Sequence, residues 1–421
     1  MPKNSSSDSL CFCLILLLTA GAISSCVSNS QGSTQKESDF AAIVIHREVP
    51  WSQRMALSIM KRNPEAWTTD FRQTPQWTYT NGLIMMAMQR LWQASGDEKY
   101  WAYAKAYADK LIDEKGQIRG YESTEFNIDH VNAGKILFLL HERTGDNRYS
   151  IALQTLREQL KWQPRTTDGG YWHKLRYPWQ MWLDGLYMGS PFLAEYGEKF
   201  GDSAAFDDVA HQLIIMEKHA LDPKTGLLRH GYDESRLQKW SDNETGQSPH
   251  VWGRAMGWYA MALVDVLDHL PQNHPQRQAL LNILRRTSNA ITTYQSKDSG
   301  LWYQVIDMAG TAGNYEEATV TCMFAYSLAR GVNQGYLEKH HMVTAQKAYQ
   351  GLIDHLIKLD DQGIMSITKC CAVAGLGGEP YRNGSFDYYV NELIRDNDPK
   401  ATGPFILASL EFEKMNIDFS K

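Results

Sequence analysis

The chain has 421 residues, a formal net charge of −6 and a hydrophobic content of 43%. This length accommodates one large domain or two to three ordinary ones. Because there is no broad basic field, nucleic acid is not an expected partner. The 13 Trp, 21 Tyr and 13 Phe lie in large part in Gly- and Asp-rich connections. Aromatic side chains placed there fit a surface that stacks on sugar rings, although ordinary core packing is the alternative.

The N-terminus has the pattern of an export signal. An apolar stretch at 10–23 follows Lys3 and is too short to span a bilayer comfortably. It ends in Ile23-Ser24-Ser25-Cys26, which resembles a bacterial lipoprotein cleavage site with Cys26 as the lipidated residue. We therefore expect an exported lipoprotein, periplasmic or at the cell surface, that meets the membrane only through its lipid anchor. The expected divisions are a signal peptide at 1–26, a polar tether at 27–44 and one catalytic domain at 45–421.

The remaining cysteines predict neither a disulfide framework nor a metal site. They are Cys322, Cys370 and Cys371, and no Cys or His partner lies at zinc-binding spacing from the adjacent pair. The sequence also contains no phosphate-binding glycine loop and no dinucleotide fingerprint. We expect no metal and no cofactor.

Two sequence marks repeat along the chain. A Gly-Asp pair followed by an amphipathic segment begins at Gly96, Gly145 and Gly201. Glycine ends one helix in a left-handed cap and the aspartate caps the next, which predicts tight αα-hairpins. Between hairpins, turns with a short strand are expected at glycines 116, 170, 226, 300 and 363.

Apolar periodicity between these marks predicts about twelve helices. The more apolar set lies near 79–94, 127–143, 180–199, 251–270, 315–331 and 402–414. The alternating, amphipathic set lies near 51–62, 98–114, 148–161, 203–219, 275–295 and 338–357. Six helical hairpins without obvious polar end caps favour an all-α fold, a closed (α/α)6 barrel with short strands and turns at its mouth. An open solenoid is the alternative.

The candidate catalytic residues are two aspartates at the starts of inner helices. In "QMWLDGLYM" Asp184 stands among apolar side chains, which favour the protonated form of a carboxyl and hence a proton donor. The preceding "YPWQMW" is expected to form the first helical turn, so capping is not the natural role of Asp184. Asp129, in "FNIDHVNAG", has the same setting one repeat earlier, where helix capping is a stronger alternative. If both face the mouth, each disfavours ionisation of the other, and one would hold a proton.

Other polar and aromatic residues gather on the same turns. His173 and Lys174 follow Trp172, and His230 stands on the corresponding turn of the next repeat, so we expect them to bind sugar hydroxyls and a carboxylate. Arg254 and Trp258 are four residues apart, on one helix face. An arginine beside aromatic rings suits a carboxylate or a stacked sugar, and a purely structural cation–π pair is the alternative.

The segments "TTDGGYWHKLRYPWQMWLDGLYMGS" and "VWGRAMGWYAMALVDVL" resemble unsaturated rhamnogalacturonyl hydrolases of glycoside hydrolase family 105. The resemblance is strongest from 126 to 266, and residues 370–403 match more loosely. It implies an (α/α)6 barrel that removes the 4,5-unsaturated uronic acid from the non-reducing end of lyase-generated oligosaccharides. It also implies that Asp184 is the proton donor and Asp129 its acidic partner. The pocket residues it implies are His173, Lys174, His230, Trp252, Arg254 and Trp258.

Three alternatives remain open at the level of sequence. An unsaturated glucuronyl hydrolase acting on glycosaminoglycan fragments would share Asp184 and differ in its pocket. A sugar isomerase or epimerase on the same barrel would use paired histidines and would not need Asp184. A lipid-anchored glycan-binding protein without catalysis would keep its function when Asp184 is replaced by Asn.

Overall fold

The computed structural model describes residues 40, 42–46 and 48–419. The expected signal peptide, with Cys26, and most of the expected tether lie outside these described residues. Within the described part, no helix combines the length and the apolar character that a membrane span requires.

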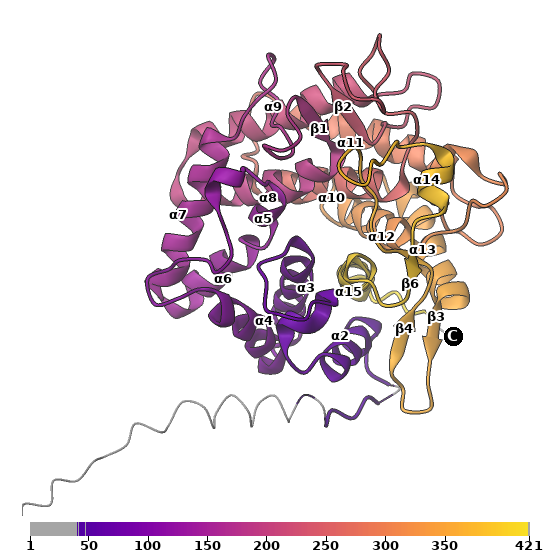
Figure 1. Ribbon diagram of the computed structural model, residues 1–421. Coiled ribbons are helices and arrows are strands. Elements are labelled where there is room, and N and C mark those ends of the chain that lie inside the picture. The colour runs from indigo at the N-terminus through magenta and orange to yellow at the C-terminus, as the bar shows by residue number, and fades with distance from the viewer. Residues whose placement is uncertain (1–39, 41, 47, 420–421) are drawn as a thin grey trace, which may run out of the picture.

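The described residues form the predicted barrel of inner and outer helices, which Figure 1 shows as one ring inside another. The inner segments are α3 (Tyr79–Ser95), α5 (Asp129–Asn132) with α6 (Lys135–Thr144), α8 (Leu183–Phe200), α10 (Gly253–His269), α12 (Ala318–Asn333) and α15 (Pro399–Glu413). The outer helices are α2 (Trp51–Arg62), α4 (Glu98–Leu111), α7 (Asn147–Trp162), α9 (Ser203–Ala220), α11 (Arg277–Thr293) and α13 (His340–Gly351).

The ring closes because the last inner helix packs against the first. Each inner helix contacts its neighbour, and α15 contacts both α3 and α2. At this seam the hydroxyl of Ser52 donates to a carboxylate oxygen of Glu413 at 2.7 Å, and its backbone N–H donates to the other oxygen at 3.1 Å. The (α/α)6 barrel is therefore confirmed, and the open solenoid is excluded.

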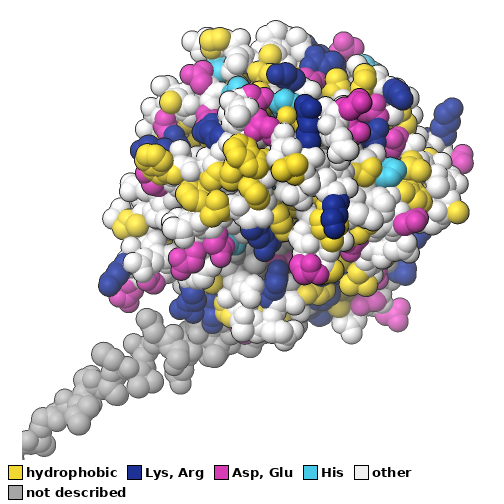
Figure 2. Space-filling view, turned by 45° about the horizontal axis from the view of Figure 1, so that its top comes forward, with side chains coloured by type: hydrophobic (Ala, Val, Ile, Leu, Met, Phe, Trp, Pro, Cys, Tyr) yellow, Lys and Arg dark blue, Asp and Glu magenta, His cyan; other side chains and the backbone are white. Residues whose placement is uncertain are grey.

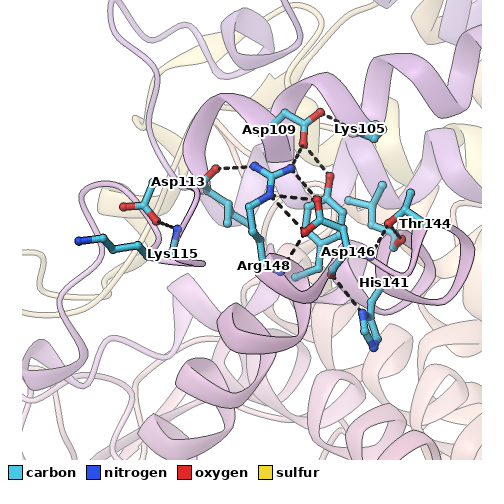
Figure 3. Close-up of polar contacts among 11 residues, drawn as sticks. Lys105, Asp109, Asp113, Lys115, His141, Thr144, Asp146 and Arg148 are labelled. Atoms are coloured by element: carbon cyan, nitrogen blue, oxygen red, sulfur yellow. Dashed lines mark hydrogen bonds and ion pairs between the residues drawn. The ribbon is translucent and has the colours of Figure 1, made fainter.

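All three Gly-Asp pairs form the predicted helix junctions, and in two of them the aspartate side chain caps the next helix. Gly145 adopts φ +66°, and Asp146 caps α7 by accepting from the backbone N–H of Arg148 at 2.9 Å. The Arg148 guanidinium also bonds Asp146 at 2.7 Å and Asp109 of α4 at 3.2 Å, which ties two outer helices together (Figure 3). Asp97 caps α4 in the same way. The side chain of Asp202 makes no capping bond and accepts from Arg157 instead, so the capping prediction is wrong there.

Short strands lie in the connections. They are β1 (Gln180–Trp182), β2 (Gly231–Asp233), β3 (Ile357–Leu359), β4 (Met365–Ile367), β5 (Cys370–Cys371) and β6 (Ile394–Arg395), paired in order as three antiparallel ladders. Gly363 forms the predicted turn between β3 and β4. At the 170 turn, Gly169 and not Gly170 takes the left-handed conformation.

Irregular turns complete the connections. Short 3-10 turns occupy Ala66–Asp70, Ser123–Glu125 and Ile306–Met308, a π-helical turn covers Leu352–Leu356, and the five-residue α14 covers Phe386–Val390.

The second inner helix is broken where a continuous one was expected. Between α5 and α6 the backbone switches to three-residue hydrogen bonds, such as Gly134 N–H to Val131 C=O at 2.9 Å. Here α5 lies so close to α3 that a Cβ on Gly82 would be 2.4 Å from the Cα of Ala133. This close approach brings the start of α5, and with it Asp129, against the barrel interior.

Candidate active site

A cavity of about 450 Å³ opens at the end of the barrel where the loops enter the inner helices. Four of the residues predicted from sequence line it, namely Asp129, His173, Lys174 and Asp184. The other four lie behind the wall. His230, Trp252, Arg254 and Trp258 are each at most 1% exposed and are not among the lining residues.

Strand pairing fixes the position of Asp184. β1 pairs with β2 in the register Trp182 to Gly231, and the N–H of Leu183 donates to the carbonyl of His230 at 3.0 Å. The prediction of a helical turn over 177–182 is therefore wrong, because 180–182 form a strand and the helix begins at Leu183. Asp184 falls in the first turn of α8 and makes no capping bond with its side chain.

The ladder brings His230 next to the Asp184 carboxyl. The Nε2 atom of His230 lies 3.1 Å from Oδ2 of Asp184. On the other side of the ring, Nδ1 of His230 is 2.8 Å from the hydroxyl of Tyr389. The imidazole is fully buried, so its orientation relative to the carboxyl is fixed. Tyr389 lies in the segment that the sequence matched only loosely, and its only sequence signal was the aromatic run "FDYYV".

Asp129 is held in the ionised form. Its Oδ2 accepts from Nζ of Lys174 at 2.5 Å, and its Oδ1 lies 3.3 Å from Nε2 of His173. Burial opposes ionisation of Asp129, but the charge of Lys174 and the contact with His173 outweigh it and lower the pKa to about 2. Asn127, and not Asp129, supplies the local cap, because its Oδ1 accepts from the N–H of Asp129 at 3.2 Å.

His173 lies beside Asp129 and packs on Trp182, which shortly precedes Asp184. Its ring stacks on Trp182 at 4.5 Å between centroids and 16° between planes. A Cβ on Gly185 would lie 2.9 Å from Nδ1 of His173, so the residue after Asp184 has to be small. Burial lowers the pKa of His173 to about 4, although Asp129 opposes this. The imidazole is therefore neutral at pH 7.

An aromatic cluster supports this end of the barrel. Tyr177, Trp182, Trp240 and Leu376 form a small buried cluster that joins three separate segments. Arg382 lines the cavity beside it and donates to the hydroxyl of Tyr177 at 2.9 Å. Sequence reasoning missed Arg382, and the glycine-rich stretch 375–384 that carries it was the one available signal.

Arg254 anchors the cavity wall from behind. Its guanidinium donates to the carbonyls of Cys371 and Ala372 and lies 4.6 Å from the ring centre of Trp252. On the opposite side, the carboxylate of Glu317 accepts from the N–H of Cys371 at 2.8 Å. Strand β5 is thus held between two buried charged groups immediately before Val373 and Ala374, which line the cavity.

Trp258 also lies behind the cavity, where it stacks on Tyr187 at 4.8 Å between ring centroids. Among the described residues there is no cluster of three or more His, Cys, Asp or Glu side chains that could hold a metal ion. The carboxyl and imidazole side chains that line the cavity are those of Asp129, Asp184, His130 and His173.

Comparison with known proteins agrees with this geometry. A family model described as Glycosyl Hydrolase Family 88 matches residues 51–416. A solved glycoside hydrolase of family 105 from C. acetobutylicum is 46% identical with a TM-score of 0.84, covering 87% of this chain and 100% of that one. Protein Atu3128 of Agrobacterium fabrum is 40% identical over 230 residues, which is 53% of this chain and 97% of that protein.

A more distant relative is the unsaturated rhamnogalacturonyl hydrolase YesR of Bacillus subtilis. It is 26% identical over 240 residues, which is 55% of this chain and 64% of that protein. The barrel, with a cavity that holds two aspartates at its mouth, is that of a glycoside hydrolase. The chain belongs to the family that the Glycosyl Hydrolase Family 88 model defines. It also groups with the family 105 enzymes, through the solved relative that is 46% identical.

The buried, neutral His173 predicts an acid-sensitive fold. Its folded pKa of about 4 lies below the ordinary 6.5, so between these values the unfolded chain binds more protons. The free energy of unfolding should therefore fall by up to about 3 kcal/mol from this residue as the pH drops from 6.5 to 4. In His173→Asn this part of the pH dependence should disappear in denaturant titrations at pH 7 and pH 4.5.

The matched control is His355→Asn, which removes an exposed histidine and should leave the pH dependence unchanged. An unaltered slope in His173→Asn would show that this histidine is protonated as easily in the folded as in the unfolded protein.

Proposed function

We propose that this glycoside hydrolase removes the 4,5-unsaturated uronic acid from the non-reducing end of lyase-generated oligosaccharides by hydrating its vinyl ether. The observation that carries the proposal is the unequal setting of the two cavity carboxylates. Asp129 is paired with Lys174 at 2.5 Å, whereas Asp184 faces His230 and has no lysine or arginine within ion-pair distance among the described residues. Asp129 is thus held ionised by a cation, whereas the group beside Asp184 is an imidazole.

The chemistry of the substrate matches this division. In a 4,5-unsaturated uronic acid, C4 is nucleophilic, and a positive charge at C5 is stabilised by the ring oxygen. A proton added to C4 therefore creates an oxocarbenium-like centre at C5, to which water adds. The resulting hemiketal opens, and the glycosidic bond then breaks without direct attack on the anomeric carbon. The spacing rule for two carboxylates in ordinary glycosidases does not apply to this route.

Asp184 is the group that moves the protons. It donates its proton to C4 and afterwards accepts one from the attacking water, which is ordinary general acid–base catalysis. Nε2 of His230 lies 3.1 Å from its carboxyl, and Tyr389 holds the opposite nitrogen of the same imidazole. Ionised Asp129 does not supply a proton at neutral pH, so its role is to accept hydrogen bonds from sugar hydroxyls.

The remaining residues bind or shape the cavity. His173 and Lys174 line it directly, and Arg382 adds a cation that is partly buried beside Tyr177. These groups are placed to meet the uronate carboxylate and the ring hydroxyls. Trp252, Arg254 and Trp258 act from behind the wall, because each is almost completely buried. Relatives support the substrate class, since YesR is named an unsaturated rhamnogalacturonyl hydrolase.

Loss of ultraviolet absorbance by the conjugated double bond measures the reaction directly. The wild-type protein should remove it in at least one of three digests, made from pectic, ulvan-type or glycosaminoglycan polymers by their lyases. In Asp184→Asn, kcat should fall about 10²–10⁴-fold, because the amide cannot donate a proton to carbon. Asp129→Asn should raise KM as well as lower kcat, since it removes the ionised acceptor of hydrogen bonds from the sugar hydroxyls.

The control variant is Asp361→Asn, which changes an exposed aspartate in the β3–β4 turn and should keep full activity. Undiminished turnover by Asp184→Asn would remove this residue from the reaction. Unchanged absorbance in every digest, together with measurable binding of the fragments, would favour a glycan-binding protein instead.

We also propose that the chain is exported and anchored through a lipid on Cys26, on the strength of the "ISSC" pattern at 23–26. In a bacterial host, the full chain should incorporate labelled fatty acid and remain in the membrane fraction. Cys26→Ser should lose the label and shift to the soluble exported fraction. Equal labelling of both chains would contradict an anchor at this residue.

A further inference from the structure

Three arginines stand at the mouth of the cavity, and the reaction described above uses none of them. Arg72 precedes α3, Arg119 precedes α5 and Arg176 precedes β1, and all three line the cavity while remaining exposed. We call this set the arginine rim (Arg72, Arg119 and Arg176). Three successive connections of the barrel thus each place one guanidinium at the same opening.

The arginine rim has few carboxylate partners. Arg72 lies 3.3 Å from Asp70, but Arg119 and Arg176 have no carboxylate within ion-pair distance in the part of the chain that the structure describes. Arg176 instead lies over the ring of Tyr177, 5.0 Å from its centre. Guanidinium groups left without counter-charges are free to bind an anionic ligand.

The excess of positive charge is local to the cavity. The lining includes five lysines and arginines and two aspartates, in a chain whose formal net charge is −6. On the face that Figure 2 turns forward, acidic and basic side chains are interspersed among hydrophobic ones, with no field of a single sign. A cavity that is lined mainly by cations attracts anionic ligands although the protein as a whole is acidic.

The uronate that is removed does not account for the rim. Its carboxylate is attached to C5, next to the carbon that Asp184 protonates, so it must lie about as deep as Asp184. The less exposed cations of the lining are Lys174 and Arg382, whereas the arginines of the rim are exposed. The rim lies farther out, where the remainder of the oligosaccharide leaves the cavity.

We propose that the arginine rim is a subsite for a second negative group, a sulfate or a carboxylate, on the sugar chain beyond the bond that is broken. This inference rests on the proposed function, because the rim is defined relative to the unsaturated end. The enzyme then selects fragments of polymers that are charged along their length. Arg119 and Arg176, from two different loops, bind the second anion, and Arg72 flanks it.

The test compares substrates that share the unsaturated uronic acid and differ in the next sugars. One set carries a neutral sugar, one a sulfated sugar and one a further uronate. In Arg119→Gln/Arg176→Gln, KM for at least one charged set should rise about tenfold with kcat unchanged. KM for the neutral set should stay within about twofold. Added salt should raise KM of the wild type for the charged substrate and affect the double variant much less.

The control is Arg285→Gln, which removes a half-buried arginine of outer helix α11 that does not line the cavity, and it should change KM for neither kind of substrate. If KM of the double variant rises for the sulfated set, the ligand is a sulfate; if it rises for the set with a further uronate, the ligand is a carboxylate. Equal losses on neutral and charged substrates, or no change on any, would overturn the rim as a subsite.

A binding measurement separates this inference from the proposed function. If the wild type turns over no substrate, the same fragments are titrated against its tryptophan fluorescence. Binding of charged fragments that the double variant loses would uphold the rim while the proposed reaction fails. Binding that is equal in both proteins would overturn the rim.

Discussion

The antiparallel pairing of β1 with β2 is the constraint on which the rest of the site depends. It joins the connections that enter the third and fourth inner helices and sets Trp182 opposite Gly231. The N–H of Leu183 then bonds the carbonyl of His230, so that Asp184 and His230 face each other at 3.1 Å. Without this ladder the two residues would sit at the ends of different helical hairpins, with nothing to fix their separation.

The same short strand also orders the neighbouring side chains. Trp182 ends β1 and stacks on His173, which in turn contacts Asp129. The N–H of His173 donates to the carbonyl of Gln180 at 2.7 Å, which fixes the turn that carries Lys174. One strand of three residues therefore positions both carboxylates, one through the backbone and the other through a stacked histidine.

The two aspartates show how surroundings divide one residue type into two roles. Both occupy the start of an inner helix and both are 15% exposed at the side chain. A lysine from the loop before β1 reaches Asp129 and holds it ionised, while only an imidazole reaches Asp184. In the proposed reaction, this difference in partners makes one carboxyl the general acid and the other a fixed anion.

Local sequence patterns were sufficient to predict the barrel. The spacing of apolar residues gave the inner and outer helices, and Gly145 with Asp146 marked a junction that the structure shows. These features depend on residues a few positions apart, which is why periodicity and capping chemistry locate them. Asp202 looked the same in sequence, yet Arg157 from another helix takes its carboxylate.

The sequence predicted those site residues that stand in a recognisable motif. Asp184 and Asp129 stand in distinctive segments, and the cavity contains both. The strand before Asp184 was missed because a run of three residues among aromatic side chains fits a helical turn as well as a strand. Only its pairing with residues 231–233 identifies it as a strand. Tyr389 and Arg382 come from a remote loop, so no local pattern could connect them with His230 or Tyr177.

The most direct test of the account is the fate of solvent hydrogen during turnover in deuterated water. Protonation of C4 by Asp184 predicts that one deuterium is incorporated at C4, on a single face, at the rate at which the double bond disappears, as NMR would show. Release of a uronic acid that still carries the double bond and no deuterium at C4 would mean direct attack on the anomeric carbon, and would contradict the account.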